Sequence, residues 1–161
     1  MKSKGGLALA ILLVVGAMAA TPAHAASTRA EYVTQAEGIC SAPTGQLIGL
    51  VNQINKVKKA APHLTPTQGA HRLGRIISRL GQIETNILNQ LATLVPAPGD
   101  EGTVAQWLQG GHNAANLVLA AGRRGKHGKL RGLLSTLGRS IPVADQANAL
   151  VAGWGFQSCV F

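Results

Sequence analysis

The chain has few of the residues on which catalytic and metal-binding motifs depend: its 161 residues include six acids, five histidines and two cysteines. No C-x-x-C pair is present, which disfavours a redox dithiol. No two histidines have the H-x-x-x-H spacing of a helical metal site. No G-x-S-x-G sequence surrounds a serine, so the nucleophile elbow of many hydrolases is also missing. We therefore expect a protein that is not an enzyme and that holds no metal ion or cofactor.

Aromatic residues are scarce too, at 3% of the chain. Sequence-tolerant binding of nucleic acid uses aromatic side chains beside basic ones as stacking platforms. Trp107 and Trp154 instead occupy expected core faces, so specific nucleic-acid binding is not predicted. A phosphate-binding loop ending at Lys129 is excluded by spacing, because Arg123 stands where a glycine is required and Leu130 where a serine or threonine is required.

The first 25 residues have the form of a signal peptide. Lys2 and Lys4 precede the uncharged apolar run Leu7–Ala20, and the small-x-small sequence ending at Ala25 suits a signal peptidase. A retained membrane anchor is the alternative, but the run is shorter than the roughly 20 residues that span a bilayer. We expect cleavage near Ala25 and a secreted or extracytoplasmic location, in the cell wall or periplasm.

Residues 26–161 have the length and composition of a single folded domain. The formal charge is +9 for the whole chain and +7 once Lys2 and Lys4 are removed, while apolar residues make up 46% of the sequence. Such a composition does not fit a disordered tail. Helical periodicity dominates and no segment alternates like a strand, so we predict an all-α fold, a small bundle of four to five helices.

Local signals mark several helix boundaries. Thr28 and Glu31 have the spacing of a capping box, and Pro43 predicts a break or kink after the first helix. Pro66 suits the first position of a helix, and Asp100 can cap the N-terminus of another through its side-chain oxygen.

Apolar stripes mark the faces that these helices should bury. A short stripe is formed by Leu47, Leu50, Val51 and Ile54. The longest lies on one helix and is more typical of the central packing surface of a bundle than of a coiled coil between chains. Its members are Leu73, Ile76, Ile77, Leu80, Ile83, Ile87, Leu91 and Leu94. Gly110-Gly111 implies a close helix contact or a kink in the next helix, and a last helix is expected to open at Ser140, Pro142 and Asp145.

The two cysteines, Cys40 and Cys159, are best interpreted as disulfide partners, because an exported chain meets an oxidising compartment. A bond between them would join the two ends of the mature chain. In the chain-entropy model, closing so long a loop restricts the unfolded state by about 5 kcal/mol.

The two ends of the mature chain also carry a resemblance. The sequence Ala36-x-x-Ile39-Cys40 near its start and Trp154-Gly155-Phe156-x-x-Cys159 at its end resemble patterns in a loose group of small secreted or lipoprotein-like helical proteins of actinobacteria. The resemblance implies a helical bundle with Cys40 paired to Cys159, and it implies no catalytic residue. Trp154 stands where the group has tyrosine.

A basic stretch at 123–131 is the densest charge feature and has no acid. We interpret it as a basic loop that binds an anionic partner such as a lipid headgroup or wall polymer, because clustered cations attract phosphate and carboxylate groups. The candidate anion-binding residues are Arg123, Arg124, Lys126, Lys129 and Arg131. The alternative is that they are only solvated and complement a helix dipole.

The sequence therefore predicts a non-enzymatic binding or interaction module. Two alternatives remain open: a bundle that holds a small apolar ligand between the stripe of residues 76–91 and Trp107, and a hydrolase in which a serine, a histidine and an acid converge. Glu84, beside the stripe, is expected to form a salt bridge with an arginine or, less favoured, to be an acid with a raised pKa. Trp154, Phe156 and Phe161 should seal the bundle end near the disulfide.

Overall fold

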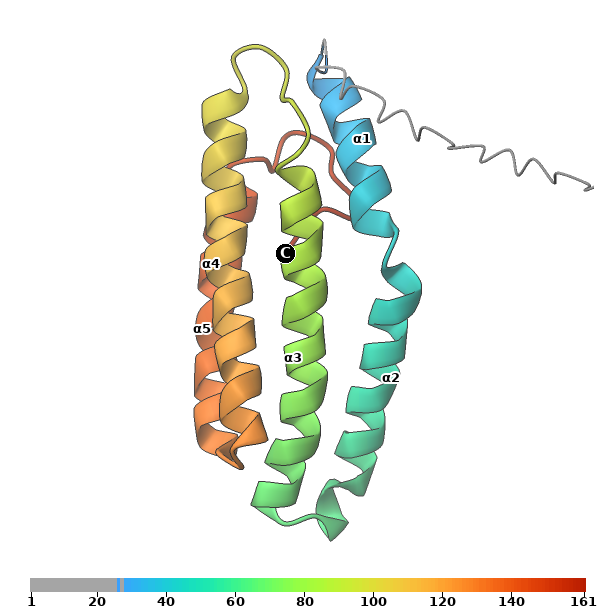
Figure 1. Cartoon of the computed structure of the whole chain (residues 1–161), viewed down its shortest axis with the longest axis vertical. Coiled ribbons are helices and arrows are strands. Elements are labelled where there is room, and N and C mark those ends of the chain that lie inside the picture. Colours follow the sequence, from blue (N-terminus) through green and yellow to red (C-terminus); the bar gives the residue numbers. More distant parts are fainter. Residues whose placement is uncertain (1–25, 27) are drawn as a thin grey trace, which may run out of the picture.

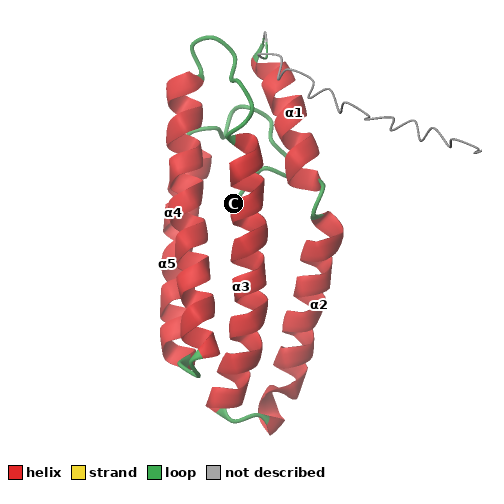
Figure 2. Ribbon diagram, in the orientation of Figure 1, coloured by secondary structure: helices red, strands yellow, loops and turns green. Residues whose placement is uncertain are grey.

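A computed structural model describes Ala26 and residues 28–161, and the expected signal peptide, residues 1–25, lies outside this part. The described chain is all-helical, as predicted (Figures 1 and 2). Its five α-helices are α1 (Arg29–Ser41), α2 (Thr44–Ala60), α3 (Pro66–Leu91), α4 (Glu101–Lys126) and α5 (Leu130–Ala149), with a short 3-10 turn at Ala61–His63. No helix among these residues is long and apolar enough to cross a bilayer.

The helices form an elongated bundle around α3 (Figure 1). α1 and α2 follow one another down one side, α3 returns in the middle, and α4 and α5 form an antiparallel pair on the other side. α4 packs extensively against both α3 and α5, whereas α2 packs mainly against α3. α2 is consequently the least covered of the long helices, and Leu50 is its one buried residue.

The predicted local signals account for several helix ends. The Thr28 hydroxyl accepts from the Glu31 amide while the Glu31 carboxylate accepts from the Thr28 amide, which completes the capping box. A second capping box joins Thr65 and Gln68 directly around Pro66, the first residue of α3. Pro43 separates α1 from α2, as the break in the pattern predicted.

Two boundary predictions were wrong. Asp100 precedes α4, but its side chain makes no cap and instead pairs with Arg29. No new helix opens at Ser140, because α5 runs unbroken from Leu130 through an exposed Pro142. Its buried face continues past the proline at helical spacing and packs against α4, which offsets the lost backbone hydrogen bond. The members of that face are Leu133, Thr136, Ser140, Ala144 and Ala147.

Glycines let α3 and α4 approach closely. A Cβ atom placed on Gly74 would lie 2.5 Å from the backbone carbon of Gly125, so neither helix tolerates a side chain at this crossing. The Gly110-Gly111 pair is also a close contact, as expected: a Cβ on Gly110 would meet Ala147 of α5 at 2.6 Å, and one on Gly111 would meet Leu88 of α3 at 2.7 Å.

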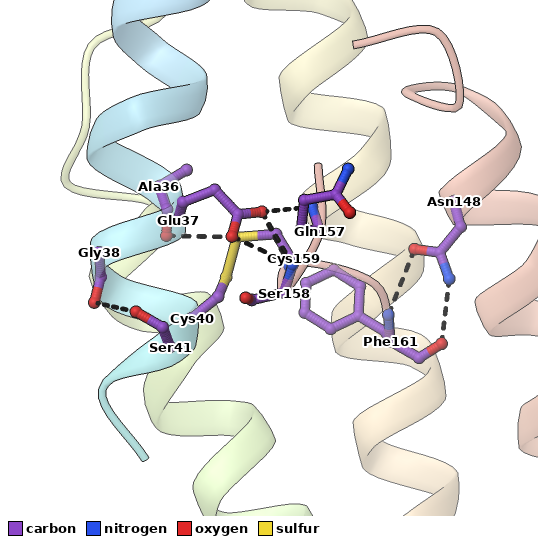
Figure 3. Close-up of a disulfide and its surroundings, with 10 residues drawn as sticks. All are labelled: Ala36, Glu37, Gly38, Cys40, Ser41, Asn148, Gln157, Ser158, Cys159 and Phe161. Atoms are coloured by element: carbon purple, nitrogen blue, oxygen red, sulfur yellow. Dashed lines mark hydrogen bonds between the residues drawn. A yellow bond between two sulfur atoms is a disulfide. The ribbon is translucent and has the colours of Figure 1, made fainter. Parts of the chain in front are cut away.

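The disulfide joins Cys40 in α1 to Cys159 in the C-terminal tail, which confirms the predicted pair (Figure 3). Glu37 fastens the same tail, because its carboxylate accepts from the backbone amides of Gln157 and Ser158 at 2.7 and 2.9 Å. Partial burial alone would raise the pKa of Glu37, but these donors, with those of the Ser158 side chain and the Cys159 amide, hold the pKa below its usual range.

The terminal aromatics close the bundle end beside the disulfide, as expected. Trp107 is fully buried, with Phe156 and Phe161 rings centred 5.1 and 5.4 Å from its own. Tyr32 is also fully buried and meets Trp154 edge-on. Burial raises the pKa of Tyr32 to about 12. Trp107 therefore belongs to the core at this end of the bundle.

Candidate anion-binding site

The predicted basic stretch is mostly helix and not a loop. Arg123, Arg124 and Lys126 form the last turn of α4, and Arg131 lies in the first turn of α5. Only residues 127–129 connect the two helices, with Gly128 at a φ of 74° that glycine adopts without strain. A helix is favoured here because cations in a final helical turn interact favourably with the helix dipole. All five predicted anion-binding side chains, Lys129 included, are exposed.

The connection between α4 and α5 lies against the beginning of α3. A Cβ atom on Gly128 would be 2.8 Å from the Thr67 side chain and 3.5 Å from the His71 ring. The close crossing of Gly74 with Gly125 lies just beyond. The bundle therefore brings the predicted cations to the same end as the first turns of α3.

Three further arginines line a groove between α2 and α3. Arg72, Arg75 and Arg79 of α3 face Lys56 of α2 across a hollow of about 580 Å³. The remaining lining residues are Gln53, Val57 and Ile76, so no acid enters it. Because the arginines are spaced three and four residues apart, they share one helical face. We call this hollow the basic groove.

Sequence reasoning missed the basic groove, although a signal was present. No acid occurs between Glu37 and Glu84, a stretch that carries six cations. These cations, in chain order, are Lys56, Lys58, Lys59, Arg72, Arg75 and Arg79. They are scattered along the chain, and only the antiparallel return of α3 beside α2 gathers them on one side of the molecule (Figure 1).

Charge is separated along the bundle. We call the half that contains the α2–α3 connection and the α4–α5 connection the basic half. It holds eleven cations: Lys56, Lys58, Lys59, Arg72, Arg75, Arg79, Arg123, Arg124, Lys126, Lys129 and Arg131. All six acids lie in the other half: Glu31, Glu37, Glu84, Asp100, Glu101 and Asp145. Arg139 lies at the midpoint of α5 and is counted with neither half. Cations gathered on one side of a protein attract anions over a distance comparable to the Debye length.

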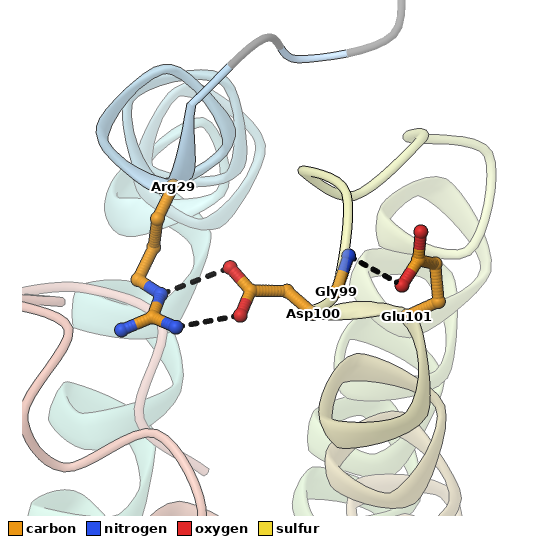
Figure 4. A network of polar contacts seen from close by, with 4 residues as sticks. All are labelled: Arg29, Gly99, Asp100 and Glu101. Atoms are coloured by element: carbon orange, nitrogen blue, oxygen red, sulfur yellow. Dashed lines mark hydrogen bonds and ion pairs between the residues drawn. The ribbon is translucent and has the colours of Figure 1, made fainter.

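In the half that holds the acids, Arg29 is neutralised by one of them. Arg29 donates two hydrogen bonds to the Asp100 carboxylate, at 2.9 and 2.6 Å (Figure 4). These bonds hold the pKa of Asp100 below its usual range. Arg29 also stacks over the Trp154 ring at 4.6 Å. The pair of Arg29 and Asp100 is the one ion pair formed between described residues. The cations of the basic half therefore have no acidic partner within that part of the chain.

Comparisons of the chain with protein-family models, with curated proteins and with solved structures found no match. The resemblance of its two ends to small secreted helical proteins of actinobacteria thus stays a prediction.

A second, smaller hollow of about 130 Å³ lies between α3, α4 and α5. Glu84, Ser140 and Asp145 line it together with small residues of α4 and α5, but no histidine does. Glu84 was expected to pair with an arginine, and that expectation was wrong: no cation is within ion-pair distance of it in the described chain. Burial instead raises the pKa of Glu84 to about 7.

The four histidines that the structure describes lie in no cluster of metal-ligating side chains. His63, His71 and His127 are exposed in the basic half, and His112 is half-buried in α4. No group of three metal-ligating side chains comes together in the part of the chain that the structure describes.

Proposed function

We propose that this protein is a non-enzymatic, extracytoplasmic binding module that uses its basic half to engage an anionic partner, a surface or polymer bearing phosphate or carboxylate groups. The observation that carries the proposal is the separation of charge: eleven cations and no acid lie in one half of a rigid bundle. A disulfide between chain ends and the absence of a membrane-spanning helix among the described residues are compatible with a location outside the cytoplasm after cleavage near Ala25.

Two parts of the basic half can make the contact. The predicted residues around the α4–α5 connection are exposed at the end of the bundle, and Arg72, Arg75 and Arg79, which are exposed as well, line the basic groove. Arginine is suited to both places because its guanidinium forms bidentate hydrogen bonds with phosphate and carboxylate. The groove offers several such side chains at once, so we expect it to contribute most.

Retention on vesicles with anionic lipid and on a phosphate polymer, measured over a salt series, tests the proposal. The groove variant is Arg72→Gln/Arg75→Gln/Arg79→Gln, and the connection variant is Arg123→Gln/Arg124→Gln/Lys126→Gln. Each cation near an anionic surface contributes about 1 kcal/mol, so loss of three should weaken binding by about 100-fold at low salt. Retention on vesicles alone would indicate a membrane partner, and retention on the polymer alone would indicate a soluble polymer.

The matched control lowers the net charge equally but at the far end. Thr34→Glu/Gln35→Glu/Ser41→Glu places three acids on exposed positions of α1. We expect this control to bind within a few-fold of the native chain. If the control loses as much as the groove variant, attraction is only by net charge and no site exists. Absence of salt-dependent retention by the native chain would overturn the proposal itself.

A further inference from the structure

An apolar groove lies in the basic half, beside the basic groove, and the two have one lining residue in common, Val57. It has a volume of about 440 Å³ and is formed where α2, the α2–α3 connection, α3 and the start of α5 meet. Its large lining side chains are Ile54, Val57, Leu64, Pro66, Leu73 and Leu130. Lys58 and Thr65 are the polar residues among those that line it. We infer that this groove binds the hydrocarbon chain of a single anionic amphiphile, a fatty carboxylate taken up as a monomer, with Lys58 beside its head group.

The groove exists because α2 packs mainly against α3 and little else covers it. Five half-buried aliphatic side chains from four parts of the chain leave some of their surface uncovered toward one hollow. They are Ile54, Val57, Leu64, Leu73 and Leu130. Water against such a surface costs free energy, which an apolar occupant would recover. The volume falls within the roughly 300–1,000 Å³ of small-molecule sites.

Gly69 forms part of the wall, and the space above it is open. A Cβ atom built on Gly69 meets nothing within 4 Å, in contrast to Gly74 five residues later, where the α4 backbone is at 2.5 Å. Five residues correspond to about 140° around a helix, so Gly74 faces α4 while Gly69 lies on a different face of α3, beside the hollow. The open space at Gly69 shows that no neighbouring helix fills the hollow at that point.

The charge around the groove selects the head group. Lys58 lines it, and a lysine can lay its methylene stem along apolar surface while its ammonium group reaches water. Leu130 lies in the chain between Lys129 and Arg131, which are both exposed. No acid lines the groove, and every acid of the chain lies in the other half of the bundle. An anionic head group at the mouth would be attracted and a cationic one repelled.

The inference rests on the proposed function only for the negative charge of the head group, because the apolar lining of the groove is a separate observation. The test is the affinity of straight-chain fatty carboxylates, used below their micellar concentrations and measured by calorimetry on the native chain. Affinity should tighten by about fourfold for each added methylene until the groove is full, and then level off. The alkylammonium of matched length should bind at least about tenfold more weakly.

Two variants locate the site without endangering the fold. Gly69→Leu fills the open space and improves helix propensity, so it should abolish carboxylate binding while unfolding at or above the native temperature. Its control is Gly138→Leu, at an exposed position of α5 whose Cβ also meets nothing within 4 Å. Lys58→Gln should weaken carboxylate binding severalfold and leave an uncharged alkyl alcohol unaffected. Lys59→Gln, one residue along but not lining the groove, should change neither.

Each other outcome contradicts the inference. No binding by any carboxylate refutes it, even if salt-dependent retention on vesicles upholds the proposed function. Binding that survives Gly69→Leu places the ligand elsewhere. Equal affinity for alkylammonium and carboxylate removes the role of charge. A dimer that Gly69→Leu dissociates would show that a second copy, and not an amphiphile, covers the groove.

Discussion

Replacing Glu84 by glutamine should make the protein more stable at neutral and alkaline pH but not in acid. Glu84 lies in the second half of α3, where it faces small residues of α4 and α5 across a hollow that holds no cation. Burial raises its pKa from 4.5 to about 7, because the charged form is poorly solvated there. The folded state therefore holds on to a proton that the unfolded chain gives up.

The sign and size of the effect follow from this difference. The folded pKa is the higher one, so the protonated carboxyl favours the folded state fully below pH 4.5, and this advantage is lost as the pH rises to about 7. At 1.36 kcal/mol for each pKa unit, the cost above pH 7 is about 3 kcal/mol. Glutamine has nearly the same shape and no charge, but its amide also needs solvation, so we expect a gain of about 1–3 kcal/mol.

Thermal unfolding followed by far-ultraviolet circular dichroism at about pH 8 and about pH 4 measures the effect. The midpoint of Glu84→Gln should exceed that of the native chain by several degrees at the higher pH and match it at the lower one. Asp145→Asn is the control, since it removes an exposed carboxylate from the same hollow. Equal stabilisation by Glu84→Gln at both pH values, or none at either, would refute the argument from burial.

Two further predictions concern the packing. Replacing Cys40 and Cys159 with alanine should lower the free energy of unfolding by about 5 kcal/mol in denaturant titrations, because the bond closes a loop over 119 positions of the chain; a change below about 1 kcal/mol would contradict the loop-entropy account. Gly74→Ala should destabilise by about 1–3 kcal/mol, since its Cβ would meet the α4 backbone, whereas Gly69→Ala in the same helix should stabilise by up to about 1 kcal/mol. Stabilisation by both alanines would show that α3 and α4 can move apart at no cost.

Features encoded within a few residues could be predicted from the sequence. The capping box at Thr28 depends on Glu31 three residues later, and the start of α3 depends on Pro66, so neither requires a distant partner. The disulfide was predictable for a different reason: with two cysteines there is only one intramolecular pairing to consider. These features depend only on residue types and on spacings that can be seen in the sequence itself.

Predictions failed where contacts with a distant part of the chain outweighed a local signal. Asp100 stands at a helix start and could cap it, but Arg29 lies 71 positions away in the chain and reaches its carboxylate in the fold. Pro142 ordinarily ends a helix, yet the face that α5 buries against α4 holds the helix together on both sides of the proline. In each case the stronger interaction came from outside the local segment.

The sequence by itself determined that this chain is helical, basic and fastened at its ends, because propensity, charge and cysteine number are properties of the residues alone. Only the tertiary structure decided that Glu84 is half-buried without a cation, that eleven cations gather in one half, and that α2 leaves grooves against α3. The physical reason is that burial and electrostatic potential depend on which distant surfaces meet. Helical periodicity indicates that a face is apolar, but not which neighbour covers it or whether the cover is complete.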